Sequence, residues 1–471
     1  MYYARQTFLV AGLSRSGIAA SEFLLAHSAR VYCFDDVEEG SVAATASMLK
    51  ERGCTVVKRD ELEARAAECD VLVLSPGIPV DHPLPVSFRR AGKRIIGEAE
   101  LGALAIRCPV VAVTGTNGKT TTVTMIDGVF KAAGFKSVAC GNIGQPICSC
   151  VGELGEDGVA VAEISSFQLE TLYSLRPHIA VVLNVAEDHL NRHYNMENYV
   201  YLKSRLLKNS AESEYAVLNY DDPIVRSFAE KTKAKIVWFS LREPVEGGYI
   251  SEGCFCYCGE KLFPVSDLPL DGEHNAANAL AAICAAKLMG VQSETIAAAL
   301  KTFRGVAHRL QRIGELNGVT FIDDSKATNV DSAIKAVKSV RGESVLLLGG
   351  KDKGYSYEPL FDAIKNSGIV HCVIYGENAF RILNAALKKG YTSVTLCRPF
   401  DVAVRVAYLT AKKGQNLLLS PASASFDSFR NYEERGERFR ELLNVLSSEG
   451  AEKRETQEPP AIQTEEDAFT E

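Results

Sequence analysis

Residues 113–122 read Val113-Thr-Gly-Thr-Asn-Gly-Lys-Thr-Thr-Thr122. An apolar run over residues 109–113 precedes this loop, and the residues from Thr120 onward have the pattern of a helix. A loop between a strand and a helix points successive backbone N–H groups into one concavity, where phosphate oxygens bind. Lys119 supplies a positive charge for the outer phosphates, and the Thr120 hydroxyl can hold Mg²⁺. The stretch therefore predicts a nucleoside triphosphate site in an α/β domain.

The match to the general phosphate-loop pattern, G-x-x-x-x-G-K-[ST], is not complete. Its first glycine would fall at Val113, so the loop is the shorter form Gly115-Thr-Asn-Gly-Lys119. The alternative is a glycine-rich turn with an incidental lysine. The order strand, loop, Lys-Thr and helix favours the phosphate site over that alternative.

Length and composition limit the possible classes of protein. A chain of 471 residues suggests about three domains. The net charge of −7 gives no reason to expect nucleic acid as a partner, and no apolar run reaches the roughly 20 residues of a membrane span. The N-terminus lacks the layout of a signal peptide, and the 13 cysteines are scattered. We expect a cytoplasmic monomer with reduced thiols.

Alternating strand and helix patterns predict an α/β fold with mostly parallel sheets and flanking helices. Three domains are expected: a Rossmann-like domain over residues 1–97, a P-loop ATPase-like domain over 98–304 and a second Rossmann-like domain over 305–447. The segment 448–471 is acidic and poor in apolar residues, so we expect a disordered tail. A polar, turn-rich segment is expected over 240–271.

The first domain carries three polar features at the ends of expected strands. They are the turn Gly12-Leu-Ser-Arg-Ser-Gly17, Asp35 and Ser75. Open α/β sheets bind ligands at the carboxyl ends of their strands. Ser14 stands where the dinucleotide pattern G-x-G-x-x-G requires its second glycine, so a dinucleotide is weakly supported.

In the central domain, two expected strands end in groups that can bind metal. Glu163 ends one strand, and Asp188 and His189 follow the other. A carboxylate in the same sheet as the phosphate loop suits Mg²⁺, although each residue alone could have a purely structural role. Together with the phosphate loop they indicate one active site.

Three polar loops follow strands of the third domain, at residues 323–329, 349–354 and 420–427. They predict a single substrate surface. His308-Arg309 comes at the preceding domain boundary, where an arginine can bind phosphate or serve only as a linker charge. The run Cys254-Phe-Cys-Tyr-Cys258 has the spacing of a strand more than that of a zinc site, with metal binding and redox chemistry as alternatives.

These motifs together resemble the Mur ligase family, the ATP-dependent amide-forming ligases of peptidoglycan precursor synthesis. The resemblance covers the chain from near residue 8 to about 445. Its most specific motifs are Gly115-Thr-Asn-Gly-Lys-Thr120, Glu163-Ile-Ser-Ser-Phe-Gln168, Glu273-His-Asn-Ala-Ala-Asn278, His308-Arg309 and Asp324-Ser-Lys-Ala-Thr-Asn329. The loop Leu419-Ser-Pro-Ala-Ser-Ala-Ser-Phe-Asp-Ser-Phe429 is most similar to the D-glutamate-adding members, which usually have Cys where Ser423 stands here.

The resemblance implies the substrates UDP-N-acetylmuramoyl-L-alanine, D-glutamate and ATP, with two Mg²⁺ ions. For catalysis it implies Lys119, Glu163, His189 and Lys203, and for metal binding Thr120, Glu163, His189 and Lys203 as its carbamate. For ATP it implies Gly115, Thr116, Asn117, Gly118, Lys119, Thr120, Thr121, Asn275, Arg309, Asp324 and Lys326. For the UDP-linked substrate it implies Ser14, Asp35, Ser75, Gly77, Asn142, Ser165 and His189, and for D-glutamate Thr328, Lys353, Ser425 and Phe426.

The implied reaction passes through an acyl phosphate and a tetrahedral intermediate and releases ADP and phosphate. Other family members that add a different amino acid stay possible, as does a folylpolyglutamate synthetase-like ligase, which lacks a domain ahead of the phosphate loop. A nicotinamide-dependent dehydrogenase would leave the phosphate loop unexplained. A non-catalytic nucleotide-binding protein would not need the polar loops of the third domain.

Overall fold

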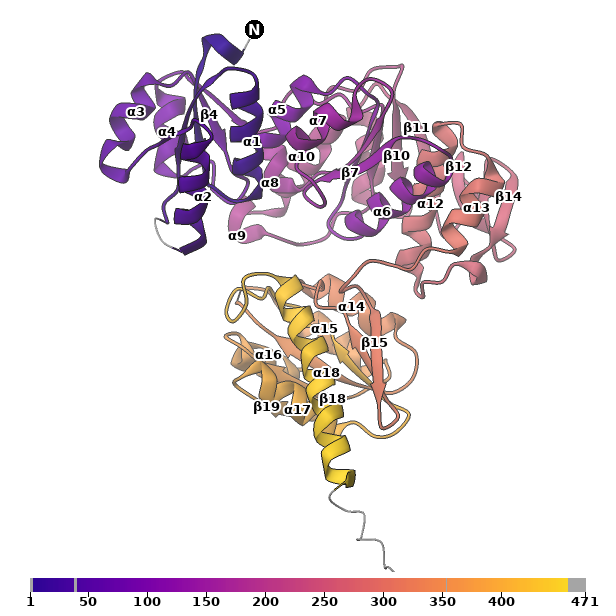
Figure 1. Ribbon diagram of the computed structural model, residues 1–471. Helices are drawn as coiled ribbons and strands as arrows, with labels where there is room; N and C mark the ends of the chain where they lie inside the picture. Colours follow the sequence, from indigo (N-terminus) through magenta and orange to yellow (C-terminus); the bar gives the residue numbers. More distant parts are fainter. Residues whose placement is uncertain (1–2, 38–39, 353, 456–471) are drawn as a thin grey trace, which may run out of the picture. The chain divides into compact units, whose positions relative to one another are not determined.

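Alternating strands and helices build three sheets in this computed structural model (Figure 1). The structure describes residues 3–37, 40–352 and 354–455. Residues up to Val306 form one compact unit, which contains the first two sheets, and residues from Ala307 form a second unit with the third sheet. The expected α/β class with mostly parallel sheets and flanking helices is confirmed.

The first sheet has five parallel strands in the order β3-β2-β1-β4-β5. This is the Rossmann order, in which the chain reverses direction across the sheet between β1 and β4. The strands are β1 (Thr7–Ala11), β2 (Arg30–Phe34), β3 (Thr55–Val56), β4 (Val71–Leu74) and β5 (Arg94–Gly97). The helices are α1 (Arg15–Ala26), α2 (Gly40–Glu51), α3 (Leu62–Glu68), α4 (Pro83–Arg90) and α5 (Glu98–Ala105).

The central sheet has nine strands in the order β14-β13-β12-β11-β10-β9-β6-β8-β7. The run from β12 to β7 is parallel, and β13 and β14 are antiparallel additions. The strands are β6 (Val110–Thr114), β7 (Ser137–Gly141), β8 (Val159–Glu163), β9 (Ile179–Val182), β10 (Tyr215–Asn219), β11 (Lys235–Ser240), β12 (Gly247–Ser251), β13 (Cys254–Tyr257) and β14 (Glu260–Pro264).

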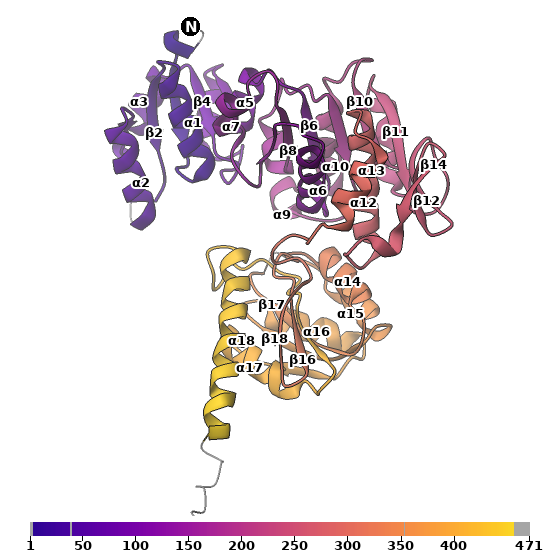
Figure 2. The ribbon, with the colours of Figure 1, turned by 45° about the vertical axis from the view of Figure 1, so that its right-hand side comes forward.

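Alternate residues of β6 face two separate apolar cores, because successive side chains of a strand point to opposite faces. Val111 and Val113 pack with α6 and α12, while Ala112 packs with α7 on the other face. Figure 2 shows α6 beside α12 and α13. The helices are α6 (Lys119–Ala132), α7 (Ile147–Leu154), α8 (Ser166–Glu170), α9 (Leu190–His193), α10 (Met196–Ser204), α11 (Pro223–Arg226), α12 (Glu273–Leu288) and α13 (Ser293–Lys301).

The second unit contains six strands in the order β15-β16-β20-β17-β18-β19, of which only β15 is antiparallel to its neighbour. The strands are β15 (Gln311–Leu316), β16 (Val319–Asp323), β17 (Ser344–Gly349), β18 (Ile369–Tyr375), β19 (Val394–Leu396) and β20 (Asn416–Leu419). The helices are α14 (Val330–Ser339), α15 (Glu358–Lys365), α16 (Ala379–Lys388), α17 (Phe400–Thr410) and α18 (Tyr432–Glu455).

Two expectations about the chain differ from the structure. The segment 240–271, expected to be turn-rich apart from the strand favoured at Cys254–Cys258, also contains β12 and β14, because these short strands carry little apolar patterning. Helix α18 continues to Glu455, so residues 448–455 are helical rather than disordered. The rest of the expected tail, 456–471, lies outside the described residues. Among the described residues, no helix is long and apolar enough to cross a membrane.

Candidate active site

The phosphate loop lies between β6 and α6, as its sequence predicts. Gly115 and Gly118 have φ angles of 154° and 87°, which residues with a Cβ rarely adopt. A Cβ on Gly118 would lie 2.3 Å from Oδ1 of Asn278, so the loop and α12 approach closely at this point. Asn117 and the Thr120 and Thr121 side chains are buried beside the start of α6. The backbone geometry is that of an anion-binding loop.

Lys119 folds back over the loop that precedes it. Its Nζ donates to the carbonyl oxygens of Gly115 at 2.9 Å and Thr116 at 2.8 Å. The ammonium therefore lies against the loop that is expected to bind phosphate and brings a positive charge to it.

Glu163 ends β8, which pairs with β6 so that Val113 and Glu163 are register partners. The Thr120 hydroxyl donates to Glu163 Oε2 at 2.8 Å, and Asn142 Nδ2 donates to Oε1 at 2.7 Å. Two neighbouring oxygen ligands of an octahedral Mg²⁺ ion lie about 3 Å apart. The hydroxyl and carboxylate oxygens therefore fit the ligand set of Mg²⁺.

Lys203 comes from α10 and is 1% exposed. Its Nζ donates to Gly115 O at 2.7 Å and to Thr114 Oγ1 at 3.3 Å, so it reaches the underside of the phosphate loop. Burial, and secondly the positive charge of Lys119, lower the pKa of Lys203 well below its usual value. The sequence could place this lysine near the loop only through the family resemblance, because α10 is distant along the chain.

His189 follows β9, the other neighbour of the phosphate-loop strand. Its Nε2 lies 3.5 Å from Asp188 Oδ2, and its ring centroid lies 4.7 Å from that of Phe167. The φ angle of His189 is 54°, which places this residue in the left-handed region. Because β8 and β9 flank β6, their carboxyl ends bring Glu163 and His189 to the same edge of the sheet as the phosphate loop.

Three residues of this cluster were not predicted from the sequence. Asn184 brackets Asn117, accepting from its N–H at 2.9 Å and donating to its carbonyl at 3.0 Å. Tyr199 lies 3.1 Å from the Thr116 hydroxyl and places its ring 5.2 Å from Lys203 Nζ. Asn278 touches Gly118. The spacing of Asn278 three residues after Asn275, on one helix face, could have indicated it.

Asn275 lies in the first turn of α12 and is buried. Its Nδ2 donates to Asp271 O at 2.8 Å, while Oδ1 has no hydrogen-bond partner in the described part of the chain. A buried amide oxygen without a partner is costly unless a ligand or water donates to it.

The residues expected to bind the UDP-linked substrate lie around the Gly12 turn. A Cβ on Gly12 would lie 2.5 Å from that of Ser75, and the Ser14 and Ser75 hydroxyls are 3.5 Å apart. Asp35 accepts from the backbone N–H of Leu13 at 2.7 Å. These contacts hold the turn at the strand ends.

Of the other four residues expected at this substrate, Asn142 and His189 lie in the cluster around the phosphate loop described above, and Gly77 and Ser165 lie nearer α9 and α8. Arg192 of α9 lies 3.5 Å from the carbonyl oxygen of Gly77, and this contact links the first two domains. Ser165 caps α8, accepting from the N–H of Gln168 at 3.3 Å, so its hydroxyl already has a structural role.

In the second unit, Asp324 follows β16 and is buried. Ser420 Oγ donates to it at 2.8 Å and the Leu310 N–H at 3.2 Å. Burial raises the pKa of Asp324 to about 7, although the positive charge of Arg309 acts to lower it. Lys326 Nζ donates to the Tyr432 hydroxyl at 2.8 Å. Arg309, Asp324 and Lys326 therefore belong to one polar cluster.

The structure describes three of the four residues expected to bind D-glutamate, namely Thr328, Ser425 and Phe426. Ser425 is buried, and its carbonyl accepts from Ser428 and Phe429. The Thr328 N–H donates to Lys326 O at 2.9 Å. Phe426 is 67% exposed. Lys353 lies outside the described residues.

The run Cys254–Cys258 forms strand β13 and the turn after it. Cys256 is buried, whereas Cys258 is exposed. No cluster of three His, Cys, Asp or Glu side chains suited to a metal ion occurs within residues 3–37, 40–352 and 354–455. The structural strand is the interpretation that this geometry favours.

Comparison with known proteins shows the family to which the chain belongs. Residues 113–286 match the Mur ligase middle domain, and residues 308–423 match the Mur ligase glutamate ligase domain. The chain is 39% identical to the UDP-N-acetylmuramoylalanine–D-glutamate ligase of Thermoanaerobacter sp. (strain X514), over 93% of this chain and 98% of that protein. It is 40% identical to the same-named protein of Pelotomaculum thermopropionicum, over 94% of this chain and 98% of that protein.

Solved structures show the same fold at low sequence identity. UDP-N-acetylmuramate-alanine ligase from Thermotoga maritima aligns with a TM-score of 0.62 at 17% identity, over 94% of this chain and 99% of that chain. MurF from Acinetobacter baumannii aligns with a TM-score of 0.61 at 18% identity, over 94% and 93%.

Proposed function

The chain belongs to the Mur ligase family, and from that premise we propose that it joins D-glutamate to UDP-N-acetylmuramoyl-L-alanine at the expense of ATP. The relatives that carry this activity in their names match it over nearly their full length. The observation that carries the proposal is the cluster of Lys119, Thr120, Glu163 and Lys203 around one phosphate loop.

The first chemical step is transfer of the γ-phosphoryl group of ATP to the L-alanyl carboxylate. A carboxylate is a poor acyl donor, and phosphoryl transfer needs positioning and neutralisation of charge more than covalent help from the protein. The backbone N–H groups of the loop 115–118 bind the phosphates, and Lys119 balances their negative charge. Asn275, whose buried Oδ1 has no partner among the described residues, and Asn278 line the start of α12 beside this loop.

The second step is attack of the D-glutamate nitrogen on the acyl phosphate. The neutral amine forms a tetrahedral intermediate, which loses a proton from the nitrogen and collapses to the amide as the bond to phosphate breaks, and inorganic phosphate leaves with the bond electrons. We assign Thr328, Lys353, Ser425 and Phe426 to D-glutamate and Arg309, Asp324 and Lys326 to ATP. Ser14, Asp35, Ser75, Gly77, Asn142, Ser165 and His189 are assigned to the UDP-linked substrate.

The donor set supports two Mg²⁺ ions as cofactors. Thr120 and Glu163 would hold one ion, and His189 with a carbamate on Lys203 would hold the other. When bound, such ions neutralise charge on the transferring phosphoryl group. The low pKa of Lys203 supports the carbamate, because CO₂ reacts with a neutral amine and not with an ammonium.

The carbamate would also reverse an unfavourable charge. An ammonium at Lys203 is buried and close to Lys119, and both effects disfavour it. The carbamate replaces it by an anion with two oxygen ligands, which suits Mg²⁺. We further propose that the protein acts as a monomer in the cytoplasm.

The test is ADP release with UDP-N-acetylmuramoyl-L-alanine and one amino acid at a time. D-Glutamate should be required, and L-glutamate, L-lysine and meso-diaminopimelate should give only background rates. Lys119→Ala should abolish the signal with every amino acid, which separates the reaction from a contaminating ATPase. Equal turnover with L-lysine or diaminopimelate would contradict the assignment while leaving the family unchanged.

A further inference from the structure

The second unit contains a cavity of about 590 Å³ beyond the residues assigned to ATP and D-glutamate. Its lining residues come from the ends of three strands: Gly376, Glu377, Ala379 and Phe380 after β18, Leu396–Arg398 at the end of β19, and Asp427 and Ser428 in the loop after β20. Ligands of open α/β sheets bind at such carboxyl ends, and the volume is in the range of small-molecule pockets.

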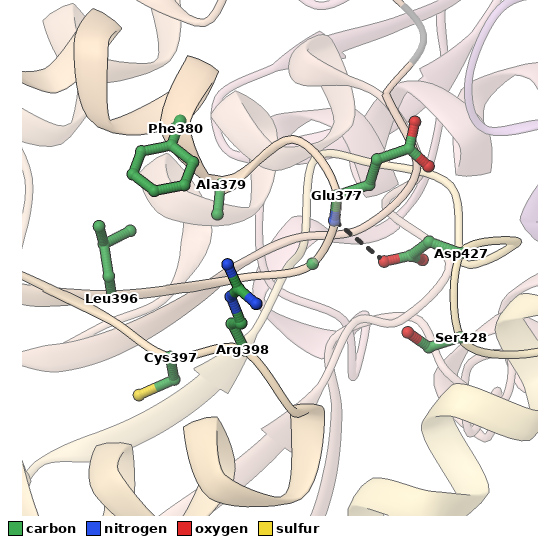
Figure 3. Close-up of a pocket in the computed structure, with 9 residues that line it drawn as sticks. Glu377, Ala379, Phe380, Leu396, Cys397, Arg398, Asp427 and Ser428 are labelled. Carbon is green, nitrogen blue, oxygen red and sulfur yellow. Dashed lines mark hydrogen bonds between the residues drawn. The ribbon is translucent and has the colours of Figure 1, made fainter.

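One wall of the cavity is apolar. Phe380 is 68% exposed and Leu396 is 41% exposed, and Ala379 lies beside them. Figure 3 shows Phe380 and Leu396 on the same side of the cavity, with Arg398 between them and Asp427. Large apolar side chains exposed together in a concave site favour an apolar group as occupant.

Charges of both signs face the same cavity. Arg398 makes no hydrogen bond or ion pair with any residue in the described part of the chain. Opposite it, Asp427 accepts from the backbone N–H of Glu377 at 3.3 Å, which orients the carboxylate. Glu377 is already neutralised, because its Oε2 lies 2.7 Å from Lys351 Nζ. Arg398 and Asp427 therefore form no ion pair with any described residue, although the positive charge of Lys351 also acts on Asp427.

Arg398 and Asp427 line one cavity but form no ion pair with each other in the structure. A ligand that carries both charges can satisfy both groups at once, with its anion on the guanidinium and its cation on the carboxylate. A simple anion would satisfy only Arg398 and would be repelled by Asp427.

We propose that this cavity binds a zwitterionic α-amino acid with an apolar side chain. The carboxylate binds Arg398, the ammonium binds Asp427, and the side chain packs on Phe380 and Leu396. The site is distinct from the one proposed for D-glutamate. The side-chain carboxylate of D-glutamate would lie against the apolar wall of Phe380 and Leu396, where no cation could neutralise it. Asp427 directly follows Phe426, so the two sites share the loop after β20.

The experiment measures binding to the full chain without ATP, so its result does not depend on the ligase reaction. L-Phenylalanine is the probe, titrated by calorimetry and by NMR. The control probes are 3-phenylpropanoate, which lacks the ammonium, and phenethylamine, which lacks the carboxylate. We expect L-phenylalanine to bind about tenfold or more tightly than either control, because each lacks one charge-assisted contact.

Two variants locate the probe. Arg398→Gln should weaken L-phenylalanine binding by about tenfold without weakening phenethylamine binding. Asp427→Asn should also weaken L-phenylalanine binding by about tenfold, without weakening 3-phenylpropanoate binding. Arg430→Gln, an exposed arginine whose partner is Glu434, is the matched control and should have no effect. Thermal denaturation confirms that each variant is folded.

Three results would overturn the proposal. The first is no detectable binding of L-phenylalanine, and the second is equal binding of all three probes. The third is displacement of L-phenylalanine by D-glutamate in direct competition, since this would place the probe in the D-glutamate site.

Discussion

At the scale of single residues, burial changes the chemistry of Lys203. A lysine on a solvated helix surface is an ammonium at neutral pH. Lys203 is enclosed below the phosphate loop beside Lys119, so the neutral amine is favoured. The residues that it contacts keep other partners, because Gly115 O also accepts from Lys119 and Thr114 Oγ1 donates to Ile164 O. Loss of its side chain should therefore affect chemistry more than folding.

We predict that Lys203→Ala abolishes ADP release while the melting temperature stays close to that of the wild type. Acetate should restore part of the activity by supplying carboxylate oxygens where the carbamate would be. Lys208→Ala, at an exposed position on the same segment, is the control and should behave as the wild type. Near-normal turnover of Lys203→Ala in carboxylate-free buffer would refute the role.

Two glycines with almost the same φ angle allow a test of how the contact with α12 shapes the phosphate loop. Gly118 has φ of 87° and Gly134 has φ of 84°, but only Gly118 has a neighbour that a Cβ would meet. Gly134→Ala should lower the free energy of unfolding by about 1–2 kcal/mol through backbone strain alone. Gly118→Ala should cost more, because its methyl group collides with Asn278, and it should also weaken ATP binding.

The prediction is tested by measuring the free energy of unfolding and the nucleotide affinity of both variants. Equal losses of stability with unchanged nucleotide affinity would show that the contact between Gly118 and Asn278 does not shape the loop.

At the scale of elements, Glu98 joins α5 to α7. Its Oε1 accepts from the N–H of Cys148 at 2.7 Å, which satisfies a donor in the first turn of α7. Figure 1 shows α5 and α7 beside each other, and α1 contacts both helices. Burial raises the pKa of Glu98 to about 7, so the protonated side chain is favoured in the folded protein.

This pKa gives a prediction with a defined sign. The folded protein binds the Glu98 proton more tightly than the unfolded chain, so Glu98 contributes stability at low pH that is lost as pH rises from about 4.5 to about 7. Glu98→Gln keeps an acceptor and removes the titration. The free energy of unfolding of the variant, relative to that of the wild type, should therefore increase as pH rises, by up to about 3 kcal/mol. Urea denaturation at pH 5 and pH 8 measures this difference, and a difference independent of pH would contradict it.

At the scale of the whole molecule, α18 completes the core of the second unit. Phe439, Leu442, Leu443 and Leu446 are buried against the sheet. The apolar spacing along one side of this helix ends at Leu446, and the sequence after Ser447 contains few apolar residues.

We predict that a chain ending at Ser447 keeps the melting temperature and the ADP release of the full protein. A chain ending at Arg438 loses all four of these apolar side chains and should fail to fold its second unit, since burial of each contributes about 1.5–3 kcal/mol. Thermal denaturation of both chains tests the contrast. A large loss in the longer chain would show that residues after 447 contribute to the fold.

Much of the fold follows from local sequence. The strands at Val71–Leu74, Val319–Asp323 and Asn416–Leu419 each contain an apolar run that can be recognised in the sequence. The phosphate loop is equally local, because its glycines, Lys119 and Thr120 act through backbone geometry set within a few residues. Strand β12 was missed because it begins with two glycines, and β14 because it is a short edge strand that is mostly exposed.

Contacts between distant segments depended on the tertiary structure. The position of Lys203 under Gly115, and of Asn278 against Gly118, comes from the packing of α10 and α12 on the central sheet. Strand order placed β8 and β9 on either side of β6, and therefore put Glu163 and His189 beside the phosphate loop. Hydrogen-bond patterns and apolar periodicity are encoded over a few residues, whereas strand order and side-chain burial depend on the free energy of the whole packed domain.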